Sequence, residues 1–145
     1  MLTIVRLLHV LAMAGWLGAT LWFGGDARRS LTGGQAEAMA FLGRARAALV
    51  LDRAAGAVAI FTGLFLVHLA HAWPPRPGLL IGAGLALVRA GLTDALLGPG
   101  LRKIATGLAG GAAPSSLAPV AQRLATVAGA AHLAWLGALA GMMVR

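Results

Sequence analysis

Long apolar runs alternate along the chain with short segments that carry charges, prolines or paired glycines. A helix needs about 20 mostly apolar residues to cross the hydrocarbon layer of a bilayer. Runs of that length occur at residues 2–24, 47–72, 78–98 and 121–144. They are continuously apolar and lack the strict alternation of a half-buried strand. The pattern therefore predicts an all-α fold, an integral membrane four-helix bundle in which residues 1–145 form a single transmembrane domain.

The predicted helix ends coincide with residues that disfavour a helix. The first run stops at Gly24-Gly25-Asp26, the second before Trp73-Pro74-Pro75 and the third at Pro99-Gly100. Proline lacks the amide hydrogen that a helix needs and clashes with the preceding turn. Before the fourth run, the composition of Gly107 to Pro119 is typical of a flexible linker.

Small residues recur four positions apart within the runs, where they would share one helix face. The pairs are Ala59 with Gly63, Gly78 with Gly82, and Ala125 with Gly129. In lipid, small residues let helix backbones approach each other closely. The pattern permits tight helix packing inside a membrane.

Composition supports the membrane class. Of 145 residues, 59% are hydrophobic and 11% are charged, whereas about a quarter of a soluble domain is charged. The chain has no cysteine, which excludes a disulfide scaffold. The sequence also lacks a G-x-S-x-G turn and a phosphate-binding loop, which excludes the common hydrolase and kinase designs.

The basic residues predict the orientation. Of the 12 basic residues, most lie on one side of the predicted bundle. These residues are Arg28, Arg29, Arg44, Arg46, Arg53, Arg102, Lys103 and Arg123, against Arg6, Arg76 and Arg145 on the other side. Positive residues favour the cytoplasm, so both termini should face the outer side. The predicted partner is the lipid bilayer and not nucleic acid, because no stacking aromatic residues accompany the basic ones.

Histidines inside the apolar runs are the first candidates for chemistry, since ionisable groups at membrane depth are costly. Counting 1.5 Å per residue places His9 and His68 in roughly one layer near the outer side. Two facing imidazoles can hold a haem iron axially. Arg6 and Arg76 would then lie near haem propionates, and Trp16 would line the ring. Alternatively, the two histidines only bond to neighbouring helices or reach the headgroups.

A metal site without haem is a second interpretation. His68 and His71 are three residues apart on one helix face, which suits copper or zinc, with His9 as a third ligand.

Three other polar residues are expected inside the bundle. Asp94 should pair with Arg53, because a buried charge needs a partner. Arg89 falls near the midplane with no acid on its own face, and we expect it in a polar cavity near His132.

The segment from Leu8 to Gly18 resembles the first-helix signature of a group of small bacterial membrane proteins, the HemJ-type protoporphyrinogen oxidases and the membrane domain of CopD copper-resistance proteins. The resemblance includes the basic segment Arg44 to Arg53 and the motif Phe61-Thr62-Gly63-Leu64 in the second helix. It ends at the basic pair Arg102-Lys103. It implies haem b at His9 and a multi-pass location in the bacterial inner membrane. The HemJ-type proteins carry a lysine near the start of the third helix, where Gly78 to Ile81 has none.

A repeated four-residue motif makes His132 an alternative to His68 as the second ligand of the haem iron. Trp16-Leu17-Gly18-Ala19 recurs as Trp135-Leu136-Gly137-Ala138, each preceded by a histidine on the same helix.

Three functions follow as hypotheses. The first is a haem b protein in electron transfer or tetrapyrrole redox chemistry, which includes a membrane oxidoreductase of the protoporphyrinogen-oxidase type. The second is a non-catalytic accessory subunit of a larger respiratory or photosynthetic membrane complex, or a homo-oligomer. The third is copper handling.

Overall fold

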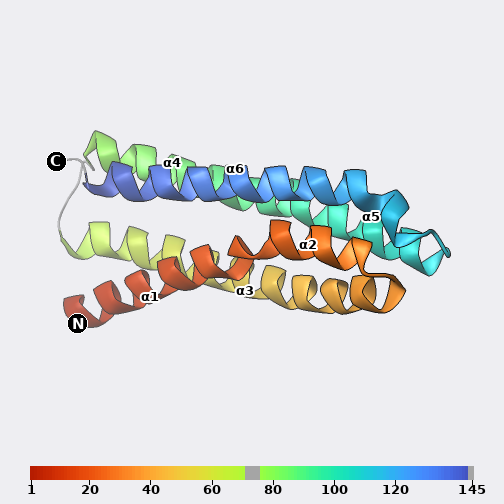
Figure 1. Cartoon of the computed structure of the whole chain (residues 1–145). Helices are drawn as coiled ribbons and strands as arrows, with labels where there is room; N and C mark the ends of the chain where they lie inside the picture. The colour runs from red at the N-terminus through yellow and green to blue at the C-terminus, as the bar shows by residue number, and fades with distance from the viewer. Residues whose placement is uncertain (71–75, 144–145) are drawn as a thin grey trace.

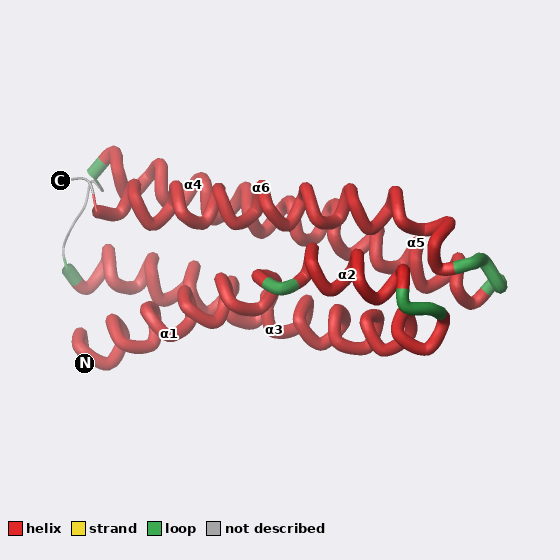
Figure 2. Tube along the Cα trace, viewed as in Figure 1, coloured by secondary structure: helices red, strands yellow, loops and turns green. Residues whose placement is uncertain are grey.

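The computed structural model describes residues 1–70 and 76–143, and these form helices joined by short turns (Figures 1 and 2). In chain order the elements are α1 (Leu2–Leu21), α2 (Phe23–Thr32), α3 (Gln35–Leu69), α4 (Pro77–Leu92), the π-helical turn η1 (Thr93–Leu97), α5 (Gly98–Ala109), the 3₁₀ turn η2 (Pro114–Leu117) and α6 (Ala118–Met143). They join into four rods, Leu2–Thr32, Gln35–Leu69, Pro77–Ala109 and Pro114–Met143, each long and apolar enough to cross a membrane. The all-α prediction with four such helices is confirmed.

The rods pair as two antiparallel hairpins. Helix α1 packs along α3, and α4 packs along α6. Helix α1 begins and α6 ends at the same end of the bundle (Figure 1). At the opposite end α2 contacts both α3 and α6, so the hairpins close on each other there and stay further apart at the terminal end.

The basic segment after the first apolar run is helical. The expectation that the first helix ends near Gly24 and that a loop leads to residue 47 is wrong. After Trp22 the chain continues as α2, and only Gly33 and Gly34 separate Thr32 from α3. Phe23, Ala27 and Leu31 follow one another every four residues and are all buried, which holds α2 as a helix.

Gly24, one of the glycines predicted to end the first helix, allows close helix packing instead. A Cβ added to Gly24 would lie 3.0 Å from the Cβ of Ala125, so α2 and α6 are in close contact there.

Pro99 does not end the third predicted helix either. The turn before it widens into η1, where the Gly98 amide donates to the carbonyl of Thr93, five residues earlier. Such a widened turn is a known way for a helix to accommodate an interruption of its hydrogen-bond ladder. The rod therefore runs on to Ala109.

The linker before the last helix is shorter than predicted. Only the residues between Ala109 and Pro114 lie outside helical turns, and Gly111 takes a positive φ of 80° there. Proline at the first helical positions of η2 is favourable, because its missing amide hydrogen would lack a partner anyway.

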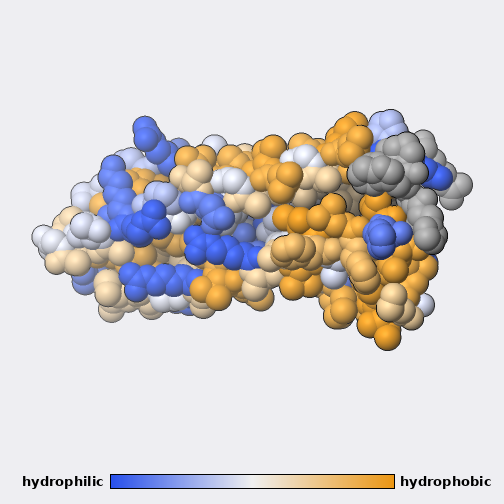
Figure 3. Space-filling model, turned by 180° about the vertical axis from the view of Figure 1, so that it is seen from behind, coloured by the Kyte–Doolittle hydropathy of each residue, from blue (hydrophilic) through white to orange (hydrophobic). Residues whose placement is uncertain are grey.

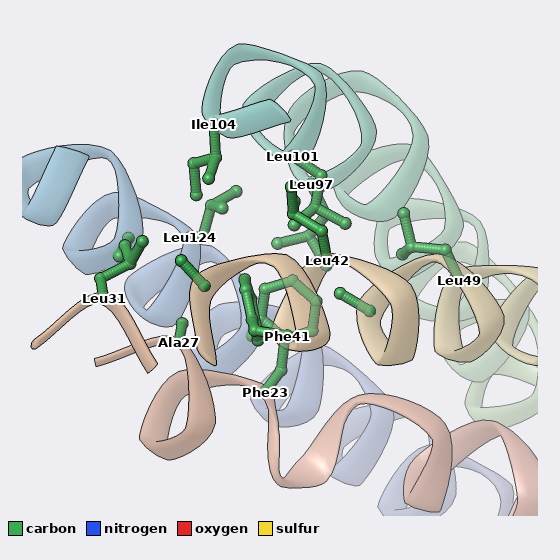
Figure 4. Close-up of a cluster of buried hydrophobic side chains, with 14 of the residues drawn as sticks. Phe23, Ala27, Leu31, Phe41, Leu42, Leu49, Leu97, Leu101, Ile104 and Leu124 are labelled. Atoms are coloured by element: carbon green, nitrogen blue, oxygen red, sulfur yellow. The ribbon is translucent and has the colours of Figure 1, made fainter. Parts of the chain in front are cut away.

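The end that contains α2 and α5 has a large buried core (Figure 4). Phe23 and Phe41 meet edge to face at its centre, with ring centroids 5.5 Å apart. Leu97, Leu101 and Ile104 approach them from the third rod (Figure 4). This half packs like a soluble helix bundle, in which burying apolar side chains drives association.

The terminal half packs through small residues. A Cβ added to Gly82 would lie 2.9 Å from the carbonyl oxygen of Ala138, and one added to Gly141 would lie 2.9 Å from that of Gly78. The backbones of α4 and α6 thus touch. The small-residue packing predicted from Gly78 and Gly82 is present.

We expect Gly82→Val to separate α4 from α6, because the new side chain overlaps the backbone of Ala138. Overpacking of this kind costs about 1–3 kcal/mol of the free energy of unfolding. Thermal unfolding in detergent measures the loss. Gly84→Val is the matched control on the same helix, because a Cβ at Gly84 meets no atom within 4 Å. Equal destabilisation by both variants would contradict the close contact.

Candidate functional site

A cleft of about 390 Å³ lies in the terminal half and is lined by residues of both hairpins. Its walls come from α1, α3, α4 and α6 and are mainly aliphatic, with Met13 and Met142 adding thioethers. Among the described residues that line it, Arg6 and His9 are the ionisable ones. An apolar cleft with few polar groups is the usual form of a site for an organic ligand or cofactor.

The His9 imidazole is oriented by α3. Its Nδ1 lies 3.0 Å from the hydroxyl oxygen of Thr62, and that hydroxyl donates to the carbonyl of Val58 at 2.6 Å. Because the Thr62 hydrogen is used there, the Thr62 oxygen accepts from Nδ1–H of His9. This bond assigns the proton to Nδ1 and leaves the lone pair on Nε2 for a ligand.

Gly63 makes room for the same ring. A Cβ at this position would lie 3.1 Å from Cε1 of His9, so the imidazole rests against the α3 backbone. His9 is half-buried as a result. The structure thus holds one histidine of the predicted pair in a fixed orientation at the wall of an apolar cleft.

The other predicted ligands do not gather around His9. His68 is exposed on α3 and is not part of the cleft wall. His132 is half-buried on α6, and its Nε2 lies 3.5 Å from the hydroxyl oxygen of Thr20. His71 lies outside the described residues. Within the described ranges, no three His, Cys, Asp or Glu side chains form a metal-binding group.

Of the residues expected around a haem edge, Arg6 lines the cleft. Arg76 is exposed just before α4 and does not line the cleft. Trp16 is buried with 1% exposure and also lies outside the cleft wall. It packs with Met13 and Ala86, which do line the cleft, so the indole lies in the layer next to it.

Arg89 is fully buried and joins three helices. Its Nη2 donates to the backbone carbonyl of Trp16 on α1 at 2.6 Å and to Oδ1 of Asp52 on α3 at 2.7 Å. The guanidinium carbon also lies 4.3 Å from the centroid of the Trp16 ring, a cation–π distance. Asp52 and Trp16 thus provide the partners of Arg89, and the expected polar cavity near His132 stays a prediction.

The expected pair of Arg53 and Asp94 is present, with Nε of Arg53 2.7 Å from Oδ1 of Asp94. It is not buried, because the two side chains are 51% and 60% exposed. A cavity of about 200 Å³ lies between this pair and Asp52. The exposed pair and the buried pair thus follow each other along the α3–α4 contact.

No protein-family profile, curated protein or solved structure matches this chain.

We expect Arg89→Met to lower the free energy of unfolding by about 3–5 kcal/mol, since it leaves the Asp52 carboxylate buried without a partner. Arg53→Met is the matched control, and its exposed pair should contribute less than about 1 kcal/mol. Unfolding in detergent, followed by circular dichroism, compares them. The double variant Asp52→Leu with Arg89→Met should recover most of the loss, because it removes both charges. Similar losses for the two single variants would refute the central role of the buried pair.

Proposed function

We propose that the chain is an integral membrane protein that binds haem b in the apolar cleft, with His9 as an axial ligand. The hydrogen bond from Nδ1 of His9 to Thr62 carries this proposal. Metal-binding histidines regularly donate their second ring nitrogen to a fixed acceptor, which sets the tautomer and the ring orientation. The resemblance of the first helix to HemJ-type and CopD-like proteins points to the same residue.

Membrane residence is the first part of the proposal. The longest rod, α3, has 35 residues and is about 52 Å long, against about 30 Å for a hydrocarbon layer. On the face shown in Figure 3, the terminal half is mostly hydrophobic, and most of the hydrophilic residues gather over the other half. The terminal half would lie in lipid, and the basic half would project into the cytoplasm. A bacterial inner membrane fits this orientation.

The chain's own residues would hold the cofactor as follows. Nε2 of His9 would bind the iron, and the aliphatic walls would exclude water from the macrocycle. Arg6 would pair with a propionate. The thioethers of Met13 and Met142 would contact the macrocycle, because both line the cleft, whereas His68 and His132 do not. Haem b bound there would supply one-electron transfer.

Oxidoreductase activity on a tetrapyrrole is a narrower proposal. Among the described residues that line the cleft, Arg6 and His9 are the ionisable ones, and no further acid or base favours such a reaction. Copper handling has less support, since the described residues include no three-ligand group. An accessory role in a larger complex, or self-association, would use the exposed apolar helix faces, but lipid covers such faces equally well.

The protein purified with haem available should show a Soret band, and His9→Ala should abolish it, because the imidazole is the proposed iron ligand. Absorption spectra of the oxidised and reduced protein make the measurement. His68→Ala is the control and should leave the band in place, since His68 lies outside the cleft wall. A protein that binds no haem, or a band insensitive to His9→Ala, would refute the proposal.

Thr62→Val should keep the haem but weaken its binding about 10–100-fold, as expected when a ligand histidine loses its hydrogen-bond partner. Haem titration followed at the Soret band gives the dissociation constant. Thr126→Val is the control, because Thr126 lies on α6 away from the cleft and bonds only to its own helix. Unchanged affinity in Thr62→Val would remove the proposed role of the hydrogen bond.

A further inference from the structure

A second, chemically different hollow lies at the basic end of the bundle. It is a groove of about 1010 Å³ between α2 and α6, and its wall is half polar in character. Arg28, Arg29 and Thr32 contribute from α2, and Gln122 and Thr126 contribute from α6. We propose that this groove binds the headgroup of an anionic phospholipid. The proposal rests on membrane residence and is independent of haem and His9.

The two arginines in the groove carry uncompensated charge. Both are exposed, and neither takes part in an ion pair with any residue in 1–70 or 76–143. Three of the four acidic residues of the chain already have a basic partner. The nearest of these in sequence, Asp26, is paired with Arg44 at 2.7 Å. The groove therefore presents two free guanidinium groups, which suit the oxygens of a phosphate.

The groove offers hydrogen-bond donors from both of its helices. Gln122 is exposed and offers an amide N–H₂ beside the arginines. The hydroxyl hydrogens of Thr32 and Thr126 are already used by backbone carbonyls of their own helices. The anion would thus meet donors from both helices of the groove, as a compact headgroup phosphate can.

The floor of the groove is apolar. Leu31 and Ala121 are buried there, and Ala125 closes the groove against Gly24. A free inorganic phosphate would gain nothing from these residues. A phospholipid would cover them with the glycerol and the first methylenes of an acyl chain, which favours binding because apolar surface is removed from water.

The groove also lies at the correct depth. Helix α1 has 20 residues and is about 30 Å long, the thickness of the hydrocarbon layer. Gly25 then falls near the boundary, and Arg28 and Arg29 lie about 10 Å beyond the end of α1. Long arginine side chains reach back toward the headgroups from that position. Anionic lipid is enriched in the cytoplasmic leaflet, which this end faces under the proposed orientation.

The experiment is native mass spectrometry of the detergent-solubilised protein with equal amounts of phosphatidylglycerol and phosphatidylcholine. The wild type should retain phosphatidylglycerol preferentially. Arg28→Gln with Arg29→Gln should reduce that retention about thirty-fold, which corresponds to about 1 kcal/mol for each of the two basic residues near an anionic lipid surface. Arg102→Gln with Lys103→Gln is the matched control, because it removes the same charge from α5 outside the groove. It should reduce retention clearly less than the groove variant does.

The variant Ala118→Trp tests the shape of the groove without changing its charge. Ala118 is exposed and lines the groove, so tryptophan would fill it while both arginines stay in place. Retention should fall with this variant as well. Equal losses from the two charge variants, no preference for phosphatidylglycerol, or an unaffected Ala118→Trp variant would each overturn the proposal. If the protein is not a membrane protein at all, a different result is expected, because it would then stay soluble without detergent.

Discussion

The buried guanidinium of Arg89 is the interaction on which the arrangement of the helices depends. It holds the backbone of α1 at Trp16 and the carboxylate of α3 at Asp52 from a position on α4. In the terminal half it joins the two hairpins together with the apolar cluster of Met13, Trp16, Ala59, Ala86 and Trp135. A buried charge tolerates little displacement, because the loss of a hydrogen bond leaves the cost of removing the charge from water uncompensated. Arg89 thus fixes the layer of the bundle next to the cleft.

The same four rods use two kinds of packing at their two ends. Around Phe23 and Phe41, large side chains interdigitate as in a soluble bundle, in which water drives the burial of apolar side chains. Around Gly82 and Gly141, backbones touch directly, as expected where lipid surrounds the helices and no such force exists. The change from one mode to the other lies near Arg89. The composition averages over both halves and therefore shows only the membrane character.

Sequence alone predicted the number and type of the long helices, because continuous apolar runs are a strong signal. It misplaced their ends, because Gly24 and Pro99 disfavour a helix in isolation but are accommodated here by contact with Ala125 and by a widened turn. Depth counting found His9 but paired it with His68, since depth does not tell which face of α3 a residue occupies. Thr62 was missed for the same reason. The partner of Arg89 lies on another helix, and spacing along α4 carries no information about it.

The π-helical turn η1 affects which side of the third rod faces the interior of the bundle. Thr93, Leu97 and Leu101 are all buried and follow one another at intervals of four residues. In a regular α-helix each such interval rotates the side chain by about 40° around the axis, so the buried stripe would wind away from its neighbours. The wider turn takes up part of that rotation. One continuous helix can therefore keep the same side inward through both halves of the molecule, although Pro99 lies in its path.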